Sequence, residues 1–235
     1  MGNWRDQMDV SIANWRLPPV VPGVWRQPSL TEGMAILNTL CDAGHEGRIS
    51  ALVGLRVLVP RFLTDTILVE ILLDTAGEGF ALSVMFAMSA DQVVHFDGTA
   101  AALDRLRAAG RVRIADDSDA RAYLILHGNL VCGEAGPFLI VESKADAPSH
   151  ISAPLIAAVL DRSLKPVVLK AVRANGAYLI EAVMCYDSTL FVVDLEVSPD
   201  GAVEMIDSEA IARGIPFRVH GFVSGFRVLH DPDSP

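Results

Sequence analysis

Hydrophobic and polar positions change their period along the chain, and each change predicts a new element. Residues 3–16 repeat large apolar side chains at four- and three-residue spacing, which predicts one face of a short helix. Residues 17–28 hold four prolines and predict an extended or turning segment. The two segments form a predicted N-terminal helical arm. Because so short a helix is marginal in water by itself, we expect its apolar face to dock on a surface.

The next stretch combines a helix with a run of strands. Ser29 opens the capping box S-L-T-E, and the predicted helix ends at Gly44. From about 48 to 96 the period changes to two, clearest in TILVEILLD and FALSVMFAM, which TAGEG joins as a hairpin. Large side chains alternate with mostly small ones in the second run, which predicts a sheet packed on one face. A short helix ending at Gly110 and strands near 111–115 and 121–127 complete this half.

The second half repeats this order. A helix is predicted over 152–163, and the strands PVVLKAVR and AYLIEAVM are joined by Asn175-Gly176, a strong hairpin signal. LFVVDLEV alternates and turns through Pro199-Asp200-Gly201 into AVEMI. A short helix over 207–214 and strands containing 217–219 and 226–229 follow.

The repeated order predicts an α+β protein made of two helix-plus-antiparallel-meander units and the N-terminal arm. The expected division is 1–28 for the arm, 29–136 for the first unit and 137–235 for the second. A diverged tandem duplication with an offset of about 100 residues is one explanation of the repeat. Two unrelated meanders that share an element order are the other.

Composition narrows the classes of partner. Hydrophobic residues make up 51% of the chain and charged ones 20%, which predicts a folded protein with a large core or an apolar interface. The net charge of −10 disfavours nucleic acid and anionic membrane surfaces as partners. We find neither a signal peptide nor an apolar run that would span a bilayer. Three widely spaced cysteines fit a reducing compartment, so we expect a cytoplasmic protein.

Candidate chemistry is sparse. The six histidines form no metal-ligand motif, and no phosphate-binding loop is present, so we expect neither a metal nor a cofactor. The segment LHGNLVCGEAGPF brings His127, Cys132 and Glu134 together among glycines. It predicts either a cleft where His127 activates the thiol, or a hairpin connection whose polar groups face water. His95 is a further weak catalytic candidate.

Two groups of residues are candidates for binding a ligand or a partner. All three tryptophans precede an arginine, in Trp4-Arg5, Trp15-Arg16 and Trp25-Arg26. Trp4 and Trp15 fall on the predicted helix face, where we expect burial, whereas Trp25 lies in the proline-rich segment. Arg105 and Arg107 belong to the main basic cluster, which either holds an acidic group or complements the end of a helix dipole.

These observations support two hypotheses of different class. The favoured one is a non-catalytic binding or interaction module with a self-associating surface, hence a homo-oligomer or a protein with a protein partner. The alternative is a small-molecule enzyme that hydrolyses an ester or thioester in an apolar pocket between helix and sheet. A pocket with two of the polar candidates in hydrogen-bonding reach would favour the enzyme.

Overall fold

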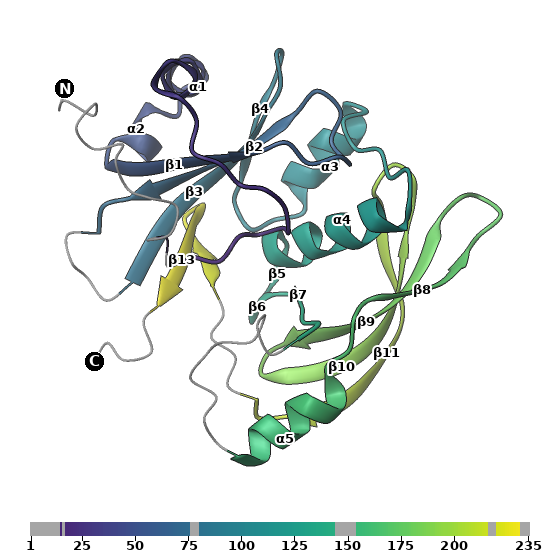
Figure 1. Cartoon of the computed structure of the whole chain (residues 1–235). Helices are drawn as coiled ribbons and strands as arrows, with labels where there is room; N and C mark the ends of the chain where they lie inside the picture. The colour runs from purple at the N-terminus through teal and green to yellow at the C-terminus, as the bar shows by residue number, and fades with distance from the viewer. Residues whose placement is uncertain (1–14, 16, 76–79, 144–153, 216–219, 231–235) are drawn as a thin grey trace.

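Helices and antiparallel sheets alternate in layers, so the fold is α+β as the sequence predicted (Figure 1). The structure is a computed structural model and describes residues 15, 17–75, 80–143, 154–215 and 220–230. The predicted helix over 3–16 lies outside these residues, except for Trp15. The helices are α1 (Leu30–Asp42), α2 (Glu46–Ile49), α3 (Ala101–Ala108), α4 (Asp117–Leu130) and α5 (Pro154–Ser163).

The first sheet is built mainly from the N-terminal half of the chain. Its strand order is β1-β2-β3-β13-β12, with β4 also paired to β3, and all pairs are antiparallel. The strands are β1 (Leu52–Leu58), β2 (Ile67–Leu73), β3 (Phe80–Met88), β4 (Val93–Phe96), β12 (Gly221–Val223) and β13 (Phe226–His230). The C-terminal hairpin therefore completes a sheet that the N-terminal half begins.

The first sheet is covered on both faces. On one face Val84 and Phe86 of β3 pack in a core with α1 and α2, and on the other Met85 and Ala87 pack with α3 and α4. The expectation of a single packed face is therefore wrong. The smaller residues of β3 lie against a second helix layer instead of facing water, because a sheet between two layers needs apolar residues on both sides.

Helix α4 lies between the two sheets, where the sequence predicted a strand over 121–127. Asp116 caps the helix and accepts a hydrogen bond from the Asp119 amide at 2.8 Å. The prediction is wrong because α4 is buried on several sides, so its apolar residues show no single helical stripe. Residues 111–115 also form no strand, and Val112 makes only an isolated bridge with Leu63.

The second sheet packs its inner face on α4 and carries α5 at one end of its outer face (Figure 1). Its order is β11-β10-β9-β7, with β8 also paired to β9, and a small pair β5–β6 stands apart. The strands are β5 (Cys132–Gly133), β6 (Gly136–Pro137), β7 (Leu139–Ile140), β8 (Val168–Val172), β9 (Tyr178–Tyr186), β10 (Thr189–Val197) and β11 (Val203–Arg213). The predicted Asn175-Gly176 hairpin joins β8 to β9.

Strand β11 continues to Arg213, so the predicted helix over 207–214 is wrong. The sequence DSEAIAR in this part of β11 contains good helix formers. Its polar and apolar residues do not alternate, because β11 is exposed over most of its length. Pairing with β10 overrides this preference. The pairing has two bulges, which leave Ile206 and Ile211 without an opposite residue on β10.

The two halves match less closely than their sequences predicted. The first half holds α4, whereas the described residues at the matching place in the second half form β12 and β13. Residues 226–230 pair with β3 although the sequence assigned them to the second unit. The duplication and the division into 1–28, 29–136 and 137–235 stay predictions. Among the described helices, none has the length and apolar character needed to cross a membrane.

Candidate functional site

A pocket of about 150 Å³ lies between α4 and the inner face of the second sheet. Helix α4, the segment around β6 and β7, and strands β9, β10 and β11 all contribute to it. The lining residues are Leu124, His127, Gly128, Phe138, Ile140, Met184, Leu195, Val203 and Met205. All are apolar except His127, so the pocket is suited to an apolar group.

Gly128 sets how closely α4 approaches the back wall of this pocket. A Cβ atom at this position would lie 2.3 Å from the carbonyl oxygen of Phe138. Only glycine allows the helix to lie this close to the backbone of the neighbouring segment. The pocket opens at the other side, where Met205 on the edge strand β11 is 46% exposed.

His127 is neutral at physiological pH. Burial lowers the pKa of His127 to about 4, because the charged imidazolium loses its hydration in the apolar surroundings. Its ring centroid lies 6.4 Å from that of Tyr123, and no described residue forms a hydrogen bond with the ring. A general base works best with a pKa near the working pH, so the site is poor for proton transfer.

The catalytic candidates lie in different surroundings. Cys132 is on β5, where burial raises the pKa of its thiol to about 11 and keeps it protonated. Glu134 is exposed in the turn after β5, and His95 on β4 places Nε2 2.8 Å from the Gly225 carbonyl oxygen. The pocket contains His127 but none of the other three. The hydrogen-bonded pair that would favour the enzyme hypothesis is not found among the described residues.

A second cavity, of about 320 Å³, lies on another side of α4. Its polar side chains already have partners within the chain. The His220 Nε2 atom lies 2.9 Å from the Asn129 carbonyl oxygen, and Glu142 accepts hydrogen bonds from Arg121 and the Val167 amide. The remaining lining residues are Pro18, Pro19, Val21, Pro22, Ile125, Leu139 and Ile140. We therefore regard the apolar pocket as the better candidate.

Behind this cavity, a buried polar network crosses the inner face of the first sheet. Glu70 accepts hydrogen bonds from Arg56 at 2.8 Å, from Ser83 at 2.8 Å and from Arg227 at 2.9 Å. Arg227 also lies 3.3 Å from Nδ1 of His220. Since Nε2 of His220 faces a carbonyl oxygen, that atom carries the proton and Nδ1 accepts, which makes His220 neutral. The network links four strands of the sheet to α4.

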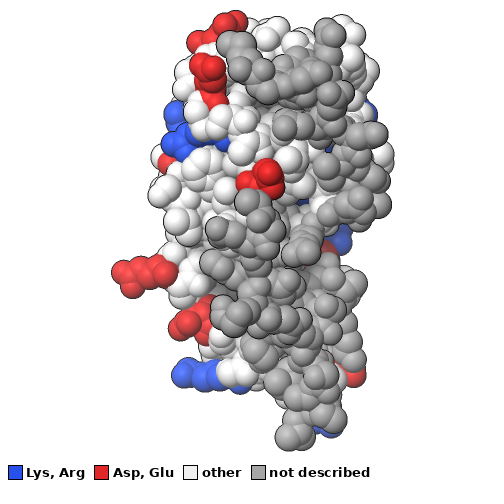
Figure 2. Space-filling view, turned by 90° about the vertical axis from the view of Figure 1, so that its left-hand side faces the viewer, with Lys and Arg blue, Asp and Glu red and all other residues white. Residues whose placement is uncertain are grey.

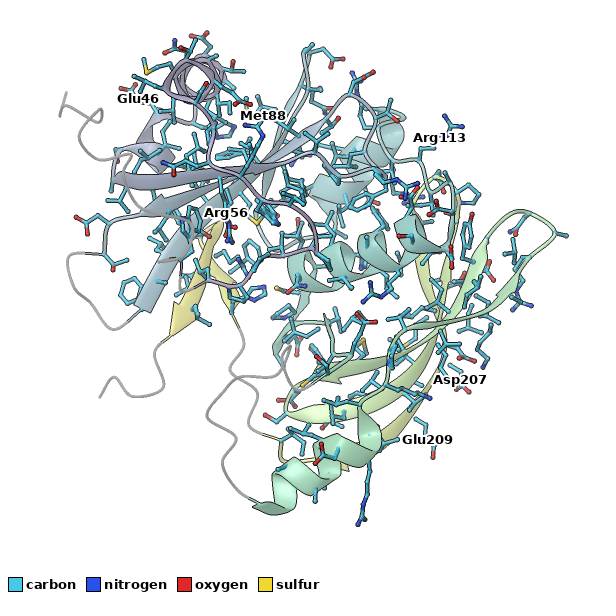
Figure 3. All side chains as sticks on the ribbon, viewed as in Figure 1. Glu46, Arg56, Met88, Arg113, Asp207 and Glu209 are labelled. Carbon is cyan, nitrogen blue, oxygen red and sulfur yellow. The ribbon has the colours of Figure 1, made fainter. Side chains whose placement is uncertain are left out.

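The described tryptophans pack against this network. The Arg56 guanidinium lies 4.3 Å from the Trp15 ring centroid and 5.0 Å from that of Trp25, and Figure 3 shows Arg56 on the side of the sheet that faces α4. Arg56 also donates to the Leu17 carbonyl oxygen at 3.3 Å. The aromatic rings and the carbonyl oxygen stabilise the positive charge that is left over when two arginines share one glutamate. Trp4 lies outside the described residues.

The two arginines proposed for binding are engaged by their own chain. Arg107 pairs with Asp104 at 3.1 Å and with Asp200 at 3.0 Å. Arg105 is exposed, and its Nε atom donates to the Ala101 carbonyl oxygen of the same helix at 3.4 Å. The contacts of both side chains fit a role in holding α3 and its neighbours.

Sequence reasoning missed most of the pocket and the whole buried network. Arg56 and Glu70 each interrupt an apolar strand, and opposite charges in the middle of neighbouring strands are a signal for a buried pair. Arg227 gave no such signal, since it follows Glu70 by 157 positions. Met184, Leu195 and Met205 look like ordinary core positions until the strand order is known.

The described residues hold no group of three His, Cys, Asp or Glu side chains arranged to bind a metal ion. A scan against protein-family models and searches of curated proteins and solved structures found no match. We therefore infer the function from the geometry of the chain itself.

Proposed function

We propose that this chain is a non-catalytic binding module that holds an apolar side chain of a protein partner in the pocket between α4 and the second sheet. The observation that carries the proposal is the size and lining of this pocket. It has a volume of about 150 Å³ and one polar side chain, which is neutral.

The size of the pocket favours a side chain over a free metabolite. Pockets that enclose a small-molecule ligand usually measure roughly 300 Å³ or more, whereas a cavity of about 150 Å³ accommodates a group of the size of a benzene ring. A single leucine or phenylalanine side chain has suitable size and polarity. The partner would contribute the rest of its contact area outside the pocket.

Methionine methyl groups offer a direct test, because Met184 and Met205 line the pocket while Met85 and Met88 lie in the first sheet. In protein labelled with [methyl-13C]methionine, added benzene should shift the resonances of Met184 and Met205 and leave those of Met85 and Met88 in place. Val203→Phe should fill the pocket and abolish the shifts. Val223→Phe, the same substitution at a site that is 59% exposed on β12, should preserve them.

Two results would contradict the proposal. The first is a pocket that stays empty, with Met184 and Met205 unmoved by benzene in the folded protein. The second is hydrolysis of a thioester that His127→Leu or Cys132→Ala abolishes, which would assign the chain to the enzyme class instead.

A further inference from the structure

Carboxylates on β11 have little compensating positive charge among the described residues, where Lys170 attracts Asp207 without forming an ion pair with it. Glu204, Asp207 and Glu209 face the outer side of the second sheet, and none forms an ion pair with another described residue. The cations of this face are used by neighbouring strands. The pairs are Lys165–Glu181 at 2.5 Å, Lys170–Asp194 at 2.8 Å and Arg173–Glu196 at 3.2 Å.

Two of these carboxylates even lie opposite other carboxylates. Asp207 is paired in register with Asp194, and Glu204 with Glu196. Like charges directly opposite each other on neighbouring strands are unfavourable. On the face shown in Figure 2, by contrast, acidic and basic side chains are scattered among uncharged ones. Lys170 attracts both Asp194 and Asp207, whereas no described cation forms an ion pair with Glu204 or Glu209.

The inner side of the same strand is apolar or small. Met205, Ser208 and Ala210 face the side of α4, since their register partners Leu195, Val193 and Phe191 belong to or pack on the core there. The pocket opens beside Met205. An extended segment that pairs with β11 would thus meet carboxylates on one side and an apolar pocket on the other.

We propose that the edge of β11, which pairs with no described strand other than β10, binds an extended segment of a partner protein in which apolar and basic residues alternate. Residues opposite each other on paired strands share a face. An apolar side chain of the partner therefore enters the pocket beside Met205, while lysine or arginine lies opposite Asp207 and Glu209. Strand addition of this kind is a common mode of peptide recognition. The inference rests on the proposed function and adds the chemistry of the partner.

The same charges disfavour pairing between two copies of this chain. Two β11 strands related by a two-fold axis at Ser208 would place Asp207 opposite Glu209 of the second copy, in addition to the carboxylates of β10. The bulges at Ile206 and Ile211 also limit the regular stretch to residues 207–210. Bulges and charged residues protect an edge strand from indiscriminate pairing, which leaves room for a segment of matching charge.

The test uses a fluorescein-labelled peptide of about eight residues in which leucine alternates with lysine, long enough to cover one strand. The matched peptide alternates leucine with glutamate. We expect the lysine peptide to bind at least about tenfold more tightly, and the double variant Asp207→Asn/Glu209→Gln to weaken its binding about tenfold. The control Asp42→Asn/Glu46→Gln makes the same charge change near α1 and α2. Figure 3 shows Glu46 at the opposite end of the molecule from Asp207 and Glu209.

Each outcome has a distinct meaning. The inference would be overturned if the two peptides bound equally, or if the control variant weakened binding of the lysine peptide as much as the β11 variant does. A benzene shift at Met205 would then still support the pocket proposal. Loss of the benzene shift as well would remove both. A dimer in light scattering that Ile206→Asp dissolves would assign the edge to a second copy and also overturn the inference.

Discussion

The two sheets of this protein differ in where their charged residues lie and in how these residues are paired. In the first sheet, Arg56, Glu70 and Arg227 are buried between helix layers, and both arginines donate hydrogen bonds to Glu70. In the second, charged residues lie on an outer face that α5 partly covers, and the carboxylates of β11 form no ion pair with another described residue. Buried charges must be paired because desolvation is expensive, whereas exposed ones are free to serve recognition. The first sheet is therefore the structural part and the second the better candidate for binding.

The largest expected difference is in the free energy of unfolding, between a substitution in the first sheet and one in the second. Glu70→Gln leaves Arg56 and Arg227 buried without an anion and should lower the free energy of unfolding by about 3–5 kcal/mol. Glu181→Gln, which breaks the exposed pairs with Lys165 and Lys170, should cost less than about 1 kcal/mol. Urea denaturation of both variants measures the contrast. Similar losses would show that burial does not distinguish the two sheets.

A smaller effect should appear in the pH dependence of stability. Above pH 6.5 His127 is neutral in both states, but between about 6.5 and about 4 the unfolded chain binds a proton that the native chain does not. Stability should fall over this window by up to about 3 kcal/mol from His127 alone. His127→Leu removes this contribution, so its stability relative to the natural chain should rise as the pH falls. Denaturation curves at several pH values check this, and parallel pH profiles would contradict it.

The smallest expected effect is a change in stability at the β11 edge, where the direction of the change is informative. Asp207→Asn keeps the acceptor for the Ser208 amide but removes the like charge opposite Asp194. We expect stability to rise by a few tenths of a kcal/mol while binding of the lysine peptide weakens. Thermal unfolding at low salt measures the gain, which 0.5 M salt should remove by screening, at a Debye length of roughly 4 Å. A loss of stability would mean that Asp207 has a structural role.

Several elements could be predicted from the sequence because local signals agreed with the fold. The helix after Ser29, the β2–β3 pair and the Asn175-Gly176 hairpin are each specified by caps, period or turn residues, and all three are confirmed. Prediction failed where tertiary contacts override local preference. The sequence of α4 resembles that of a strand because the helix is buried between two sheets. The sequence at the end of β11 resembles that of a helix because only its pairing with β10 keeps it extended.

The candidate site was predicted only in part for the same reason. His127 was selected from its loop-like surroundings, and the pocket does contain it, but on a buried helix and without Cys132 or Glu134. The acidic row on β11 depends on the register with β10, which no local pattern reveals. The sequence does show the carboxylates themselves, spaced along EMIDSE, but it predicts Glu204 on a strand and Asp207 and Glu209 on a helix.

The pairing of β13 with β3 has a consequence for how the chain is made. Arg227 reaches Glu70 only after 157 further residues have been synthesised. Until then β3 lacks its pairing with β13, and Glu70 has Arg56 and Ser83 as donors but lacks Arg227. The nascent first sheet is thus exposed to chaperones and to mispairing while the residues between β3 and β13 are synthesised. Loss of the β12–β13 hairpin would therefore damage the first sheet, although most strands of that sheet lie more than 100 residues earlier in the sequence.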